Sequence, residues 1–195
     1  MTQGVSMDSR PLLTRVVTAT NTLVDGLSVD QLAAPSPCAG WTVRDVVNHI
    51  TGGATMFAVS AEQGSVPDDV MGQIMGGDLL GDDPKGVWKA AADRALAAFD
   101  QPGILEKVVK LPFGEMPAGM ALNIAVFDLA THAADIANAT GANIADDELL
   151  EAALGMGRQF IGPDMRVAGM FDAEVTAPAG ASAATRLLAF AGRKV

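Results

Sequence analysis

The residues of this chain most suited to binding a metal ion are its two histidines and an aspartate near the second of them. The segment ALNIAVFDLATHAADIANAT, residues 121–140, has no Lys or Arg, and its ionisable side chains are Asp128, His132 and Asp135. Spacings of four and three residues place these three side chains on one face of a helix. Because an unpaired charge among apolar residues is costly, Asp128 and His132 need a partner.

His49 lies in a second amphipathic stretch, TVRDVVNHITGGATMF. Both histidines fall on apolar stripes, so we expect them to face the core. Two imidazoles and one carboxylate bind a divalent metal and leave coordination positions open for water or substrate. We therefore predict a metal site made of His49, Asp128 and His132, with zinc expected and nickel or iron(II) as alternatives. The competing interpretation is that each histidine is a core or interface residue with an ordinary hydrogen-bond partner.

Asp135 lies one turn beyond His132 and has two interpretations of equal weight. In the first, its carboxylate accepts a hydrogen bond from His132 and orients the ring, as metal-bound histidines usually require. In the second, it pairs with an arginine. Both interpretations keep Asp135 outside the set of metal ligands.

The sequence leaves the catalytic residues unassigned. Cys38 is the single cysteine, which excludes an intrachain disulfide, and we interpret it as a buried structural thiol. A phosphate-binding glycine motif, a nucleophile elbow and the H-E-x-x-H motif are all absent from the sequence. Trp41 directly precedes the capping residue Thr42, and we expect it to pack the start of that helix against the core.

Composition favours one helical domain spanning residues 1–195. Apolar residues make up 49% of the chain and aromatic residues only 5%, a mixture that suits close-packed helices. The net charge of −10 disfavours nucleic acid and membrane surfaces as partners. The start, MTQGVSMDSRPLL, lacks an apolar signal core, so we expect a cytoplasmic protein. We expect a small-molecule substrate, and a homodimer stays open.

Periodicity and capping signals predict an all-α fold, a four-helix bundle with extra short helices and a small extended segment. Two capping boxes, S-x-x-Q at 28–31 and T-x-x-D at 42–45, mark helix starts. Residues 107–119 are expected to be extended. The 64–84 connection is either a lid or a poorly ordered loop with a helical turn. The main helices are expected at about 10–27, from 42, and at 85–99, 121–140, 146–160 and 182–191.

Three segments together resemble a known family: PSPCAGWTVRDVVNHITGG, FDLATHAADIANATG and ASAATRLLAFAGR. They are similar to the actinobacterial metal-binding subgroup of the DinB-like superfamily, close to the N-terminal domain of mycothiol-dependent maleylpyruvate isomerase. The similarity runs from about Leu12 to Arg193. It implies a four-helix bundle holding a divalent metal through His49, Asp128 and His132, with Asp128 standing where the isomerase has Glu.

The resemblance implies a function as well as a fold. We expect a divalent-metal-binding transferase or isomerase that uses a low-molecular-weight thiol, mycothiol, as cosubstrate and acts on a small electrophile. A metal-dependent hydrolase is the first alternative. It ranks lower because the sequence offers only Asp135 as a candidate general base. A non-catalytic metal-binding or dimerising bundle is the second.

Overall fold

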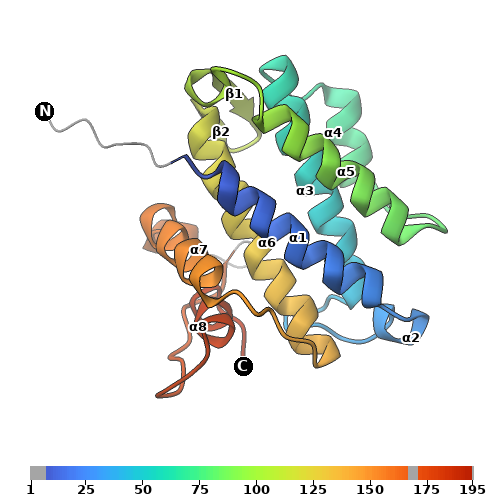
Figure 1. The fold of residues 1–195 in the computed structure, drawn as a ribbon, viewed down its shortest axis with the longest axis vertical. Helices are drawn as coiled ribbons and strands as arrows, with labels where there is room; N and C mark the ends of the chain where they lie inside the picture. The colour runs from blue at the N-terminus through green and yellow to red at the C-terminus, as the bar shows by residue number, and fades with distance from the viewer. Residues whose placement is uncertain (1–7, 167–170, 195) are drawn as a thin grey trace, which may run out of the picture.

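Four long helices lie side by side and form the body of the protein (Figure 1). The computed structural model describes residues 8–166 and 171–194. The predicted fold class is confirmed: an all-α helical bundle with short extra helices and one small hairpin. That residues 1–195 form a single domain stays a prediction. The bundle helices are α1 (Arg10–Gly26), α3 (Val43–Gln63), α5 (Pro84–Phe99) and α6 (Ala118–Thr140).

Both predicted capping boxes form. At the start of α3, Thr42 Oγ1 accepts a hydrogen bond from the Asp45 backbone N–H at 3.2 Å, and the Asp45 carboxylate accepts one from the Thr42 N–H at 2.8 Å. Ser28 and Gln31 make the equivalent pair at the start of the short helix α2 (Val29–Leu32). Such caps stabilise a helix start by about 1 kcal/mol, which fixes where the helix carrying His49 begins.

Helix α6 is the centre of the fold. It packs against α1 and α3 within the bundle and against α7 (Asp147–Phe160) and α8 (Ala183–Phe190) outside it. Its many alanines let these neighbours approach closely, and it ends as expected at Gly141, whose φ of 71° is left-handed. Among the described residues, α6 alone has the length and apolar content to cross a membrane. Since 78% of that stretch is buried inside the protein, it has the burial of a core helix.

Helices α7 and α8, in the C-terminal part of the chain, pack against α6 through aromatic rings. The ring of Phe127 lies 5.3 Å from that of Phe160 and 6.1 Å from that of Phe190. Gly157 makes room for this cluster, because a Cβ there would lie 2.4 Å from the Phe127 ring. The stretch between α7 and α8 contains a 3-10 turn, η2 (Pro163–Met165). Residues 167–170 lie outside the described chain, as do residues 1–7.

The 64–84 connection is built as a small helix fastened to α3. Helix α4 (Asp68–Met75) lies in its middle. Beyond α4, the Asn48 side chain accepts a hydrogen bond from the Leu79 N–H at 2.7 Å and donates one to the Gly77 carbonyl at 3.1 Å. Arg44 contacts Asp78 at 2.7 Å. These contacts hold the connection against α3, and α4 is the helical turn that the second interpretation of this segment included.

The segment expected to be extended forms an antiparallel hairpin. Strand β1 (Val108–Leu111) pairs with β2 (Gly114–Pro117), with Val109 opposite Met116. A short 3-10 turn, η1 (Ile104–Glu106), precedes it. The hairpin packs on α3 and α6, and its turn brings Pro112 and Phe113 to the same cavity as His49.

Candidate metal centre

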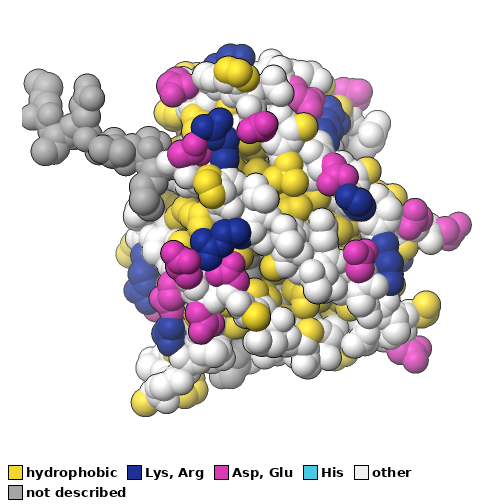
Figure 2. All heavy atoms as spheres, viewed as in Figure 1, with side chains coloured by type: hydrophobic (Ala, Val, Ile, Leu, Met, Phe, Trp, Pro, Cys, Tyr) yellow, Lys and Arg dark blue, Asp and Glu magenta, His cyan; other side chains and the backbone are white. Residues whose placement is uncertain are grey.

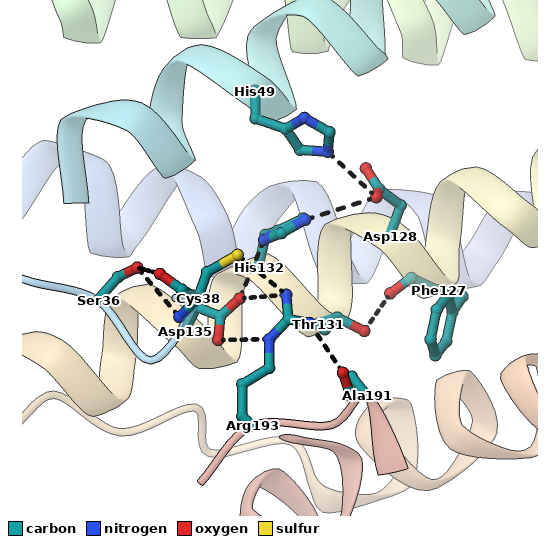
Figure 3. A network of polar contacts seen from close by, with 10 residues as sticks. All are labelled: Ser36, Cys38, His49, Phe127, Asp128, Thr131, His132, Asp135, Ala191 and Arg193. Atoms are coloured by element: carbon teal, nitrogen blue, oxygen red, sulfur yellow. Dashed lines mark hydrogen bonds and ion pairs between the residues drawn. The ribbon is translucent and has the colours of Figure 1, made fainter. Parts of the chain in front are cut away.

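Helices α3 and α6 bring His49, Asp128 and His132 together, and Figure 3 shows both imidazoles directed at the carboxylate. His49 Nε2 lies 3.4 Å from Asp128 Oδ1, and His132 Nε2 lies 3.7 Å from the same oxygen. One ligand atom from each of the three residues lies within 4.8 Å of the other two. Among the described residues, no other group of three His, Cys, Asp or Glu side chains meets this condition.

These separations suit a divalent ion. Ligand atoms about 2.0–2.2 Å from a tetrahedrally coordinated zinc lie about 3.4 Å from one another. The two carboxylate–imidazole distances match that value to within a few tenths of an ångström. Imidazole nitrogen and carboxylate oxygen are donors that zinc, iron(II) and nickel all accept. Three ligands on one side leave the other side of the coordination sphere free.

Burial is graded across the three side chains. The His132 side chain is 8% exposed, Asp128 is 28% exposed and His49 is 41% exposed. The expectation that both histidines face the core is therefore correct for His132 and wrong for His49. An apolar stripe fixes the direction in which a side chain points, but His49 points towards a cavity that the neighbouring elements leave open. The centre thus has a buried side and an accessible side.

Without an ion, the His49 and Asp128 side chains stabilise one another's charged forms. Burial lowers the pKa of His49, but the nearby Asp128 carboxylate outweighs it, so the pKa lies above its ordinary value. Burial raises the pKa of Asp128, but His49 and His132 outweigh it and hold the pKa below the ordinary range. In the metal-free site His49 therefore stays protonated to higher pH, and Asp128 stays ionised to lower pH, than the same groups in water.

Trp41 borders both imidazoles. Its ring centroid lies 5.0 Å from that of His49 and 6.0 Å from that of His132, nearly parallel to the second. We expected Trp41 only to pack the start of α3 against the core. It is packed against the core, and its ring also borders the candidate centre.

A chain of contacts continues behind His132 (Figure 3). His132 Nδ1 lies 3.0 Å from Asp135 Oδ2, which leaves His132 Nε2 facing Asp128. The fully buried Asp135 carboxylate also accepts hydrogen bonds from Arg193, at 3.0 Å from Nη2 and 3.3 Å from Nε. Asp135 therefore makes both expected contacts, one with a histidine and one with an arginine. That it orients a metal-bound ligand stays a prediction.

Cys38 touches the outer end of this chain of contacts. Its Sγ lies 3.6 Å from Arg193 Nη2, and burial raises the pKa of the thiol although the Arg193 charge opposes the shift. The side chain is half-buried, where the sequence indicated a buried one. A thiol with a raised pKa is a poor nucleophile at neutral pH, which agrees with a structural role.

A cavity of about 530 Å³ opens beside His49. The face of α3 that carries His49 forms its floor, α4 forms one wall, and the hairpin turn and the residues before α3 form the others. The site therefore has room for a small molecule next to the accessible side of the three candidate ligands.

Comparison with known sequences identifies the family. The sequence family described as "Mycothiol maleylpyruvate isomerase N-terminal domain" matches residues 13–137. The chain belongs to this family. The match spans α1 to most of α6 and so includes His49, Asp128, His132 and Asp135. The resemblance inferred from the three sequence segments is thereby confirmed.

Two further comparisons extend past the family match. Uncharacterized proteins from two strains of Mycobacterium tuberculosis are each 32% identical over 179 residues, covering 89% of this chain and 91% of theirs. Crystal structures of the mycothiol-dependent maleylpyruvate isomerase and of one point mutant each superpose with a TM-score of 0.63 at 16% identity. Each covers 80% of this chain and 70% of the isomerase chain. At that identity the superposition shows a shared family fold.

Sequence reasoning missed Arg193 as a residue of this centre. It lies three residues beyond α8 and outside the part of the chain that matches the family. The signal that pointed to it was the C-terminal segment ASAATRLLAFAGR, which supported the resemblance and ends at Arg193. Gly53 was also missed: a Cβ there would lie 3.4 Å from Asp128 Oδ2, so the glycine keeps the space beside the carboxylate open.

Proposed function

We propose that this protein is a divalent-metal- and thiol-dependent transferase or isomerase that acts on a small electrophile, with zinc as the metal and mycothiol as the thiol. The observation that carries the proposal is the arrangement of His49, Asp128 and His132, whose accessible side faces a cavity large enough for a small molecule. The family that the chain belongs to, named after a mycothiol-dependent isomerase, supports the choice of thiol.

A bound divalent ion would supply an open position that holds a thiol in its reactive thiolate form. Residues of the chain position the candidate ligands. Asp135 and Arg193 hold the His132 ring so that Nε2 faces Asp128, and Trp41 borders both imidazoles. In a transfer, the thiolate sulfur forms a bond to an electrophilic carbon while a leaving group departs with its electron pair. In an isomerisation, the sulfur forms a bond to one carbon of a conjugated C=C, whose π electrons move into the conjugated acceptor group of the substrate. After rotation about the resulting single bond, those electrons re-form the C=C bond and the thiolate departs with the C–S electron pair.

The hydrolase alternative is less well supported because the site has no free base. Asp135 was its one candidate, and that carboxylate is fully buried and engaged by both His132 and Arg193. A thiol that is already ionised needs no base, whereas water in a hydrolase usually does.

The decisive experiment uses cobalt-substituted protein and its visible spectrum. Adding mycothiol is expected to produce a sulfur-to-metal charge-transfer band, and Asp128→Ala protein treated in the same way is expected to show none. Metal analysis of untagged protein should find about one divalent ion per chain. A spectrum indifferent to thiols, together with hydrolysis of an ester or amide, would assign the protein to the hydrolases; protein that binds no metal would leave a non-catalytic bundle.

A further inference from the structure

Helix α4 forms one wall of the cavity beside His49 without being buried itself. It lies outside the four long helices and packs mainly on α3 (Figure 1). None of its eight residues, Asp68–Met75, is buried. A segment with few buried apolar contacts opens at a lower free-energy cost than the core around it. Helix α4 can therefore change position while the bundle stays folded.

Cavities lie on both sides of α4. Met71, Ile74 and Met75 line the cavity of about 530 Å³ beside His49. Ile74 also lines a second cavity, of about 290 Å³, on the side of α4 that faces α5. A movement of α4 towards His49 narrows the first cavity and widens the second. Such a movement meets open space, whereas a helix enclosed on all sides would meet close-packed side chains.

The connection that contains α4 is fastened at both ends. Before α4, the Gly64 carbonyl accepts a hydrogen bond from the Lys110 N–H of β1 at 2.8 Å. After α4, the Asn48 side chain donates one to the Gly77 carbonyl at 3.1 Å. Gly76 and Gly77 join this second anchor to the helix, and glycine accepts backbone changes that other residues resist. Helix α4 thus lies between two fixed points, with a flexible joint at one of them.

The side chains that α4 presents to the cavity are apolar and adaptable. Met71 and Met75 are four residues apart, which places them on one face of the helix. Met75, at the mouth of the cavity, is 78% exposed. Methionine fills irregular gaps because its side chain is unbranched and has several rotatable bonds. Contact of these side chains with a molecule in the cavity removes apolar surface from water, so an occupant favours closure.

From the two cavities, the fastened ends and the methionine face, we propose that α4 is a lid that turns on its anchor at Asn48. The cavity beside His49 is open in the position described above. With a molecule in the cavity, α4 moves towards His49, and Met71 and Met75 cover the molecule. Closure shields reacting groups in the cavity from water, which is how lids serve enzymes. The movement depends on an occupied cavity and not on the reaction, so the lid and the proposed function can fail separately.

The test places an occupant in the cavity of metal-free protein through a covalent tether, so that no substrate needs to be known. Met56 lies on α3 about two turns after His49 and lines the cavity. Met56→Cys, made in a Cys38→Ser background, is labelled with benzyl methanethiosulfonate. The reference is the same variant labelled with methyl methanethiosulfonate, which restores the length of methionine. The benzyl label adds one aromatic ring to the cavity.

Hydrogen exchange and methionine oxidation then report on α4. The benzyl label is expected to slow amide exchange in Asp68–Met75 about tenfold or more relative to the methyl label. It should slow oxidation of Met75 by hydrogen peroxide to a similar extent, whereas Met120, 51% exposed and outside the cavity, keeps its rate. Because one ring fills only part of about 530 Å³, protection of Met75 at the mouth requires α4 to move in. Equal exchange, or equal Met75 oxidation, with the two labels would overturn the proposal.

Asn48→Ala tests the anchor after α4. Loss of the amide should speed exchange in α4 by about tenfold, the effect of one hydrogen bond, and should reduce the benzyl effect on Met75 to less than about twofold. The control is Gln101→Ala, which removes an amide that bonds locally to the Ala97 carbonyl, and it should change neither quantity.

Circular dichroism establishes that each variant is folded. Folded Asn48→Ala protein that behaves like Gln101→Ala protein would refute a lid that turns on Asn48. If Asn48→Ala does not fold, the comparison of the two labels decides alone. None of these measurements involves a thiol cosubstrate or a metal, so a negative cobalt spectrum would leave the lid standing, and an immobile α4 would leave the proposed function untouched.

Discussion

Arg193 makes a two-pronged ion pair with Asp135, a residue 58 positions earlier in the chain. Nη2 lies 3.0 Å from Oδ2 and Nε lies 3.3 Å from Oδ1, and the carboxylate is fully buried. Asp135 Oδ2 also lies 3.0 Å from His132 Nδ1, so the C-terminal segment acts on the candidate metal centre through one carboxylate. Replacing either partner leaves a buried charge without its partner, which is more costly than losing a surface pair.

Arg193→Ala is therefore expected to lower the free energy of unfolding by about 3–5 kcal/mol, the usual cost of breaking a buried ion pair. It should also weaken metal binding by about 10–100-fold, because His132 loses its fixed orientation. Arg193→Lys keeps the charge but not the paired geometry, so it should recover only part of both effects. Urea unfolding and competition with a zinc chelator measure the two quantities.

The control for Arg193 is Arg158→Ala. Arg158 pairs with Glu174 at 3.2 Å and lies over the Phe190 ring, but its side chain is 56% exposed. Its loss should change stability by at most about 1 kcal/mol and leave metal affinity unchanged. Similar losses from both arginine variants would show that the Arg193 contact has no special connection with the metal centre.

Asp128 and Asp135 should differ in what their loss does to the metal. Asp128→Ala removes a ligand atom and is expected to abolish tight binding. Asp135→Asn keeps the shape beside His132 but not the charge, so it should reduce affinity by about 10–100-fold. Isothermal titration with zinc compares the two variants. Equal losses would mean that the roles of the two carboxylates have been assigned incorrectly.

Metal affinity should fall as the pH decreases through the pKa of His49. The Asp128 carboxylate holds that pKa above its ordinary value, and only the neutral imidazole binds a metal. Well below the pKa, affinity should drop roughly tenfold per pH unit for one competing proton. Asp128, whose pKa is lowered, stays ionised over this range and adds no dependence. Zinc titrations from pH 5.5 to 8 give the profile, and a flat one would contradict the assignment of His49 as a ligand.

The metal-free protein should show the opposite trend in stability. A raised His49 pKa contributes stability that is complete below the unfolded value of about 6.5 and is lost as pH rises through the folded value. The lowered Asp128 pKa contributes stability above about 3.9 that is lost as pH falls. The His49–Asp128 pair therefore stabilises the metal-free fold most between about pH 4 and 6.5. As the pH rises above this range, the melting temperature should fall for protein with a chelator and rise for protein with zinc.

Cys38 should react slowly with alkylating agents. Burial raises the pKa of its thiol, and the thiolate is the reactive form. Cys38→Ser should accordingly leave metal binding and thiol-dependent turnover within about twofold of the original protein. Mass spectrometry of protein treated with iodoacetamide at pH 7.5 measures the rate. Alkylation as fast as that of a free thiol, together with loss of turnover in the serine variant, would make Cys38 a functional nucleophile.

The sequence by itself determined what is local. The Asp128–His132 spacing placed both side chains on one helical face because helix geometry depends only on residue separation. The T-x-x-D pattern at Thr42 fixed the start of the His49 helix, since a cap needs only the residues that form it. The segments around these residues also indicated the family, and with it the bundle fold.

Tertiary structure decided which residues from distant parts of the sequence come into contact. His49 and Asp128 are 79 residues apart, and helical periodicity says which way each points but not which helices pack together or how closely. For the same reason the exposure of His49 could not be derived: it depends on how α4 and the hairpin turn border the face of α3. The link from Arg193 to Asp135 likewise exists only because α8 folds back onto α6.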